Sequence, residues 1–117
     1  MQAHLVRFGQ IEIGGRRYKK DVVIEAGRVR KRKKKASKAY RDRYGHTPLS
    51  LDEGIPRGGN QLVVGTGAEG RLSIMPDVLK EARRRGVNLV AMPTKEACRF
   101  LGDRPDDQIN AVLHVTC

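Results

Sequence analysis

Residues 61–101 read QLVVGTGAEGRLSIMPDVLKEARRRGVNLVAMPTKEACRFL and decide the fold of this chain of 117 amino acids. Two short apolar runs, at 61–65 and 87–92, alternate with two longer stretches suited to helices, at 76–85 and 94–101. The first stretch begins with proline, which fits the first turn of a helix, and both are followed by glycine, which ends one. The pattern predicts alternating strands and helices, and strands joined in this way pair in parallel.

A further apolar run, INAVLHV at 109–115, predicts a third strand of the same sheet. Successive residues of a strand point to opposite faces, so Leu113 and Val115 face one side while Val112 and His114 face the other. Both faces of the sheet therefore carry apolar side chains, and both must be covered.

The N-terminal part predicts a β-hairpin. HLVRF at 4–8 and IEI at 11–13 read as strands, and RRYKKDVVI at 16–24 reads as another after the pair Gly14 and Gly15. Two glycines between strand-like runs supply the positive φ angles of a tight hairpin turn. We therefore expect a single α/β domain over residues 1–117, with an N-terminal hairpin followed by a parallel βαβαβ unit in a mixed central sheet.

The formal net charge of +11 is concentrated in one segment. Residues 28–43, RVRKRKKKASKAYRDR, hold ten of the 24 lysines and arginines and one acid, so the other 101 residues carry a net charge of only +2. A short strand is expected to begin at Val29. Beyond it, like-charge repulsion and a scarcity of apolar residues predict that the segment 28–45 is exposed and mobile.

The sequence GTGAEG at 65–70 spells G-x-G-x-x-G, the glycine signature of dinucleotide-binding proteins. In those proteins the last glycine lies in the first turn of a helix whose N–H groups meet the pyrophosphate, but here the helix is expected to begin only at Pro76. The signature also requires an acid at the tip of the next strand, whereas Glu96 falls in the following helix. A tight turn explains the glycines better. No cofactor is predicted, and a nucleotide-dependent enzyme is the least favoured interpretation.

A different ligand could still bind near this loop, because ligands of open α/β sheets gather at the carboxyl ends of parallel strands. Three such ends are expected to meet here, and backbone N–H groups of the loop could hold an anion between them. The predicted anion-binding rim consists of Gly65, Thr66, Gly67, Gly70, Arg71, Pro93, Thr94 and Lys95.

The basic segment is the second candidate site. It combines cations that can neutralise phosphates with aromatic rings on which bases can stack, although no folded RNA-reading motif accompanies them. A solvated loop, a contact for an acidic protein and a nuclear-localisation signal remain alternatives. The predicted contacts to RNA or DNA are Arg28, Arg30, Lys31, Arg32, Lys33, Lys34, Lys35, Lys38, Tyr40 and Tyr44.

No catalytic or metal-binding group is predicted. His114 and Cys117 are three residues apart and point to opposite faces of a strand, and Cys98 falls on the apolar side of its helix as a core thiol. His46 reads as a hydrogen-bonding loop residue. The two cysteines show no C-x-x-C spacing, which argues against zinc and favours reduced thiols. Without a long apolar stretch or a signal peptide, the chain is expected in the cytoplasm and not in a membrane.

Several stretches resemble the Mth-domain family of small proteins of unknown function, which includes adipogenesis-associated Mth-domain-containing protein and a mitochondrial complex I assembly factor. These stretches are IEIGGRRYKKDVVI, GHTPLSL, LVVGTG with Gly70, MPDVLKEARRRGVNLVAMPTKEAC and LHVTC. The resemblance runs nearly from end to end. It implies a three-layer α/β fold around a mixed sheet, no established reaction, and a binding or assembly-type role. The first expectation is therefore a non-enzymatic domain that binds an unidentified protein or an anion.

Overall fold

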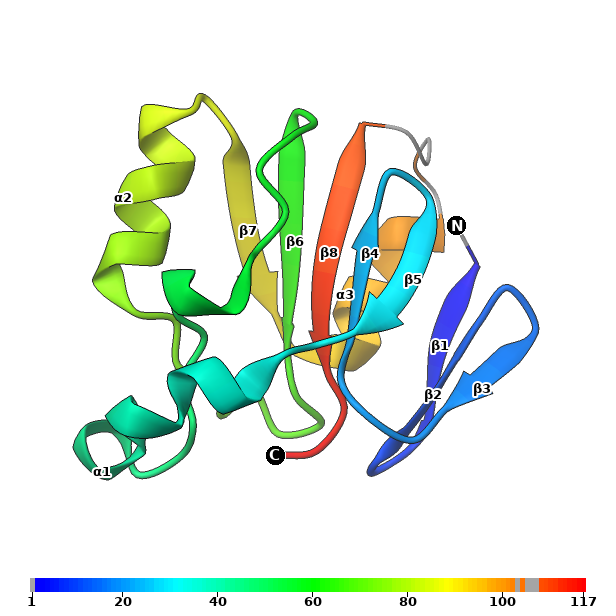
Figure 1. Cartoon of the computed structure of the whole chain (residues 1–117). Helices are drawn as coiled ribbons and strands as arrows, with labels where there is room; N and C mark the ends of the chain where they lie inside the picture. The colour runs from blue at the N-terminus through cyan, green and yellow to red at the C-terminus, as the bar shows by residue number, and fades with distance from the viewer. Residues whose placement is uncertain (1, 103, 105–107) are drawn as a thin grey trace.

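The computed structural model describes residues 2–102, 104 and 108–117. Its main sheet has five strands in the spatial order β5, β4, β8, β6, β7. Their bounds are Arg28–Lys31 for β5, Val22–Glu25 for β4, Ile109–His114 for β8, Gln61–Thr66 for β6 and Asn88–Met92 for β7. Figure 1 shows these strands side by side, with β8 at the centre of the sheet. The sheet is mixed, as predicted.

The three strands of the C-terminal half run in the same direction. β6 pairs in parallel with β7 on one side and with β8 on the other, and Val63 lies opposite Val90 and Ala111. β4 pairs antiparallel with β8 and β5 antiparallel with β4. The predicted parallel βαβαβ unit is therefore confirmed, and its three carboxyl ends lie at the lower edge of the sheet in Figure 1.

A second, smaller sheet holds the N-terminal hairpin. It consists of β1 (Ala3–Arg7), β2 (Gln10–Ile13) and β3 (Arg16–Tyr18), all antiparallel. The hairpin is confirmed, but the prediction of one strand over 16–24 is wrong. The chain leaves the small sheet after Tyr18 and enters the main sheet at Val22 as β4. The two sheets compete for this segment, and the buried apolar residues 22–24 pair with β8 instead.

The main sheet has a core on each face, which makes three layers. Helix α3 (Thr94–Gly102) and the small sheet cover one face, where Cys98 and Leu113 are buried together. Helix α2 (Pro76–Arg84) covers the other, where Val78 packs into the same cluster as Val112. Figure 1 shows α2 and α3 on opposite sides of the sheet. The alternation of inward and outward residues expected for β8 is confirmed.

The basic segment folds over the second face rather than ending as a bare loop. After β5 it forms the 3₁₀ helix η1 (Lys34–Tyr40) and the single helical turn α1 (Arg41–Tyr44), and the chain beyond it forms the 3₁₀ turn η2 (Leu51–Glu53). Most of its lysines are exposed as expected, but Arg32 and Ser37 are buried. In Figure 1, η1 crosses in front of the sheet near the carboxyl ends of β6 and β8.

Within the described part of the chain, every helix is too short or too polar to cross a lipid bilayer.

Candidate functional site

The carboxyl ends of the three parallel strands are tied together by one side chain. Thr94, which begins α3 just after β7, is fully buried. Its hydroxyl accepts a hydrogen bond from the Gly67 N–H (2.8 Å), just after β6, and donates one to the carbonyl oxygen of His114 at the end of β8 (2.5 Å). The three strand ends therefore converge, as expected, and Thr94 is a structural clamp.

The backbone N–H groups of the glycine loop are already occupied. The N–H of Ala68 donates to the Thr116 carbonyl oxygen at 2.7 Å, and those of Glu69 and Arg71 donate to the main-chain oxygen of Cys117 at 3.2 and 2.9 Å. The Gly70 N–H donates to the carbonyl oxygen of Gly67. None of these groups points free into solvent, so they cannot hold the anion that the sequence suggested.

Two glycines of the loop are required by close packing. A Cβ atom on Gly67 would overlap the carbonyl group of Cys117, and φ at this residue is +109°. A Cβ atom on Gly65 would lie 2.8 Å from the hydroxyl oxygen of Thr94. The loop must let residues 116 and 117 pass directly beside it. The G-x-G-x-x-G spacing is therefore explained by a tight turn and by the close approach of the C-terminal backbone to Gly67.

Of the eight residues of the predicted rim, only Arg71 lines a cavity at the strand ends. The first three residues, at 65–67, and Thr94 are buried, and their polar groups serve the fold. Gly70, Pro93 and Lys95 are exposed outside the cavity. We call this depression of about 330 Å³ the strand-end cavity. Its walls are formed by Arg32, Lys34, Lys38, Arg41, His46, Thr47, Arg71, Leu72, His114, Thr116 and Cys117.

Beneath the cavity lies a buried charge cluster centred on Arg32. The guanidinium donates from Nη1 to Asp21 Oδ2 at 2.8 Å and from Nε and Nη2 to the Glu53 carboxylate at 2.6 and 2.8 Å. It also donates to the Pro48 carbonyl oxygen at 3.0 Å. The Ser37 hydroxyl donates to Glu53 Oε2. Burial would lower the pKa of Arg32, but these carboxylates outweigh burial and raise it. Arg32 thereby fastens the basic segment to the sheet.

Asp21 also holds the ring of His114. The distance from Asp21 Oδ2 to His114 Nδ1 is 2.7 Å, and the Val115 N–H donates to Asp21 Oδ1 at 2.9 Å. Burial would raise the pKa of Asp21, but the hydrogen bond and charge of His114, the Val115 N–H and the charge of Arg32 together lower it to about 2. The carboxylate is therefore ionised and fixes a proton on His114 Nδ1.

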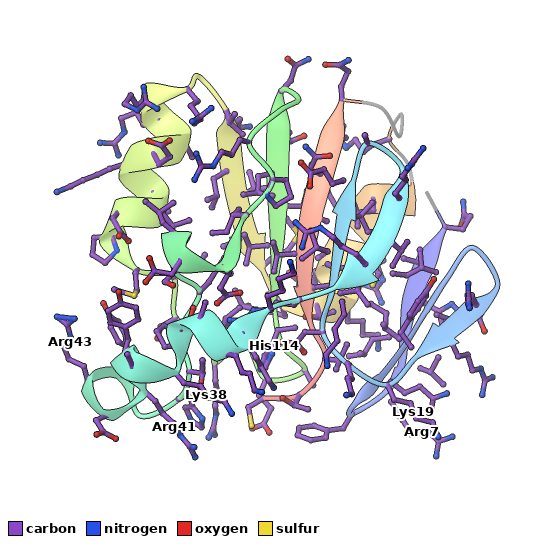
Figure 2. All side chains as sticks on the ribbon, in the orientation of Figure 1. Arg7, Lys19, Lys38, Arg41, Arg43 and His114 are labelled. Atoms are coloured by element: carbon purple, nitrogen blue, oxygen red, sulfur yellow. The ribbon has the colours of Figure 1, made fainter. Side chains whose placement is uncertain are left out.

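A second hollow adjoins the strand-end cavity on the side of β5. This cationic groove, of about 740 Å³, shares Arg32, Lys34, Lys38 and Thr116 with the cavity. The lysines along it are Lys19, Lys20, Lys31, residues 33–35 and Lys38. Figure 2 shows Lys38 and Arg41 on one side of the end of β8 and Lys19 and Arg7 on the other, all along the lower edge of the molecule.

The lysines of the groove have no acidic partners in the described residues. Its walls include two acids, Asp21 and Asp52, but Asp21 is bound to Arg32 and His114, and Asp52 accepts a hydrogen bond from the Tyr40 hydroxyl at 2.7 Å. The pKa of Lys31 is lowered, first by its side-chain contact with Lys20 and by the charge of Lys20. Desolvation and the charges of Lys35 and Lys34 lower it further. Uncompensated like charges at this density destabilise one another unless an anion binds.

The lysines and arginines predicted to contact nucleic acid divide into three groups. Lys31, Lys38 and residues 33–35 line the groove. Arg32 also lines the groove, but its guanidinium is hydrogen-bonded to buried carboxylates. The prediction that Arg32 contacts phosphate is therefore not supported. Arg28 and Arg30 lie outside both hollows.

The two tyrosines are half-buried and contact other parts of the protein. Tyr40 and Tyr44 pack against the core cluster that contains Leu49. The Arg43 guanidinium lies 5.8 Å from the centre of the Tyr40 ring and 6.0 Å from that of Tyr44. Because core side chains and a cation contact these rings, the stacking role expected from the sequence has no support in the geometry.

Two acids of the cluster were hard to foresee from the sequence. Glu53 looks like a helix-start residue but is buried against Arg32, and Asp21 stands alone between Lys20 and Val22. For Asp21, the available signal is its position directly before the buried apolar run 22–24. Cys98 is a core thiol as expected, and burial raises its pKa to about 11 despite a hydrogen bond with the Leu5 backbone. Across the described residues, no cluster of three potential metal ligands is found.

Comparison with known proteins gives a family but no activity. The chain is similar over its full length to the crystal structure of a conserved hypothetical protein, PH1505, from Pyrococcus horikoshii OT3, with 32% identity, complete coverage of both chains and a TM-score of 0.81. It is also similar to the solved structure of MT938, with 23% identity, 99% and 98% coverage and a TM-score of 0.72.

A third neighbour shares the fold alone: an outer membrane protein from Bartonella henselae, with 12% identity, coverage of 99% of this chain and 97% of that one, and a TM-score of 0.62. Among curated proteins, none matches the chain. Residues 4–101 match a family model described as "Protein of unknown function (DUF498/DUF598)", which covers more than half of the sequence. The chain therefore belongs to the DUF498/DUF598 family of proteins of unknown function.

Proposed function

We propose that this protein is a non-enzymatic binding protein whose partner is a polyanion, and that the cationic groove holds this partner. The observation that carries the proposal is the run of lysines along the groove that pair with no carboxylate among the described residues. The proposal keeps the basic segment and, of the expected rim, Arg71 alone, because both line the strand-end cavity.

The chemistry of these side chains fits a repeating phosphate backbone. Lysine ammonium groups are hydrated point charges on flexible stems, which suits contacts to phosphates without a fixed geometry. Most affinity in such contacts comes from release of counterions, and this affinity falls steeply as the salt concentration rises.

We also propose that the protein lies in the cytoplasm and is related to the Mth-domain family, as the sequence predicts.

The test is binding of a fluorescein-labelled oligouridylate of about 12 nucleotides, followed by anisotropy across roughly 50 to 200 mM salt. We expect salt-sensitive binding by the native protein. Replacing Lys31, Lys34 and Lys35 by Gln should weaken it about tenfold or more at the lowest salt. The slope of log affinity against log salt should fall by about 0.7 for each phosphate that the variant no longer neutralises.

The matched control replaces Lys80, Arg83 and Arg99 by Gln. These residues are exposed on α2 and α3, and their replacement changes the net charge by the same amount. Equal weakening by both variants would show that net charge alone attracts the RNA, and absence of binding by the native protein would reject the proposal.

An assembly-type role with an acidic protein is the second candidate. The same groove would then bind carboxylates, and polyglutamate would displace the labelled RNA as well as unlabelled RNA does. The observation that favours this candidate is Phe8, a large apolar side chain that is 56% exposed in the turn between β1 and β2. Gly9, the next residue, donates from its N–H to the carbonyl oxygen of Val115, which lines the groove.

A further inference from the structure

The strand-end cavity differs from the groove in size and in its walls. Its volume of about 330 Å³ lies at the small end of the range for ligand pockets, so it suits one compact group rather than a length of chain. It opens beside the groove, since Lys34, Lys38 and Thr116 line both hollows. A strand lying in the groove could therefore place its end in the cavity.

Among the described residues that line the cavity, several are cations and none is an aspartate or glutamate, and the main-chain oxygen of Cys117 in its wall accepts hydrogen bonds from the N–H groups of Glu69 and Arg71. Lys34, Lys38 and Arg41 form no ion pair with any carboxylate in the described ranges. Among the acids that the structure describes, Arg71 pairs with Glu69 alone, at 3.3 Å, and both side chains are more than half exposed, so water and salt screen that contact. A guanidinium can donate two parallel hydrogen bonds to phosphate, so Arg41 and Arg71 suit this anion.

His114 adds a polar group whose orientation is fixed. Its side chain is only 13% exposed, with Nδ1 against the Asp21 carboxylate and Nε2 at 3.2 Å from the hydroxyl oxygen of Thr116. Both His114 and Thr116 line the cavity. The oxygens of Asp21 are directed to Arg32, His114 and the Val115 N–H, so this carboxylate does not face the cavity.

We propose that the strand-end cavity binds the terminal phosphate of a single-stranded nucleic acid whose backbone lies in the cationic groove. This inference rests on the proposed function. A phosphate monoester carries close to two charges and three acceptor oxygens near neutral pH, whereas an internal phosphodiester carries one charge. Several cations around one small cavity stabilise the doubly charged end more than an internal phosphate or a carboxylate.

The experiment compares three unlabelled octauridylates as competitors against the labelled probe. One has a 5′-phosphate, one a 3′-phosphate, and one has hydroxyl groups at both ends. We expect one phosphorylated competitor to bind at least about fivefold more tightly than the hydroxyl form, which corresponds to one or two additional favourable charge contacts.

The variant Arg41→Gln with Arg71→Gln should bring this ratio close to one, with a smaller change in the affinity of the hydroxyl form. Both residues are exposed, so the substitutions are compatible with folding. The paired control, Arg83→Gln with Arg99→Gln, should keep the native ratio.

Three results would overturn the inference. Equal affinities of all three competitors for the native protein would remove the terminal-phosphate site and leave the proposed function standing. A preference that survives in the Arg41 and Arg71 variant would place the phosphate elsewhere. No binding of any competitor would reject the proposed function, and this inference with it.

Discussion

Arg32 lies in the most basic stretch of the chain, yet its side chain is 1% exposed and pairs with two carboxylates. The sequence predicted a phosphate contact for Arg32 as for its neighbours, because a run of cations carries no sign of which member is buried. The carboxylates that bury it, on Asp21 and Glu53, come from segments on either side of the run. Their approach depends on the tertiary fold.

Replacing Arg32 by Met should lower the free energy of unfolding by about 3–5 kcal/mol, because Asp21 and Glu53 would remain buried without their cation. Urea denaturation followed by circular dichroism measures this decrease. The control is Arg17→Met, since Arg17 is 57% exposed in its pair with Glu12 and should cost about 1 kcal/mol or less. A small effect at Arg32 would contradict the structural role of the cluster.

The lowered pKa of Asp21 predicts that the stability of the fold depends on pH. Its pKa is about 2 in the folded protein against an ordinary value of 3.8, so its ionised form stabilises the fold. This contribution, about 2 kcal/mol from the shift, is complete above pH 4–5 and is lost as the pH falls towards 2. In urea denaturation across this range, the stability deficit of Asp21→Asn should shrink as the pH falls. A deficit independent of pH would exclude the linkage.

A substitution at Gly67 tests whether the glycine loop needs this residue because the backbone of Cys117 packs directly against it. Gly67→Ala should destabilise the protein by about 3 kcal/mol or more, because its Cβ atom would overlap the backbone of Cys117 at a positive φ. Thermal unfolding measures the effect. Gly70→Ala is the control, because its nearest neighbour would be 3.6 Å away and only the backbone strain of about 1 kcal/mol remains. Similar destabilisation at both positions would contradict the close approach.

At the scale of elements, the parallel strands were predictable and the basic segment was not. The strands and helices between residues 61 and 115 follow from local signals: apolar runs, Pro76 at a helix start and glycines after helix ends. The split between β3 and β4 depends on which sheet offers a partner. The 3₁₀ helix η1 depends on the distant residues Glu53 and Ser50 that meet Ser37. Neither contact leaves a local pattern.

Ser37 anchors η1 through its hydroxyl, which donates to Glu53 and lies 2.7 Å from the hydroxyl of Ser50. Ser37→Ala should cost about 1–2 kcal/mol and loosen η1. Trypsin should then cleave the segment 28–43 faster than in the native protein, with cleavage sites identified by mass spectrometry. The control is Ala36→Ser at the exposed neighbouring position. If trypsin cleaves the two variants at the same rate, the anchoring role fails.

For the whole molecule, the distribution of charge matters more than its sum. The sequence places a net charge of +9 in residues 28–43, and the fold brings part of it beside Arg71 and His114 at the carboxyl edge. The convergence of the strand ends was predictable from the sequence, but the position of the basic segment beside them was not. The two meet because Arg32 and Ser37 fix the segment across the end of β8.

The most direct test of this account is NMR mapping of the surface that a polyanion contacts. Titration of the ¹⁵N-labelled protein with a 5′-phosphorylated oligouridylate should shift the amide signals of residues 31–41, Arg71 and 114–117. The signals of Lys80 and Arg83 on α2 should stay in place. Shifts centred on α2, or scattered evenly over all exposed cations, would contradict the claim that the groove and the strand-end cavity form one binding surface.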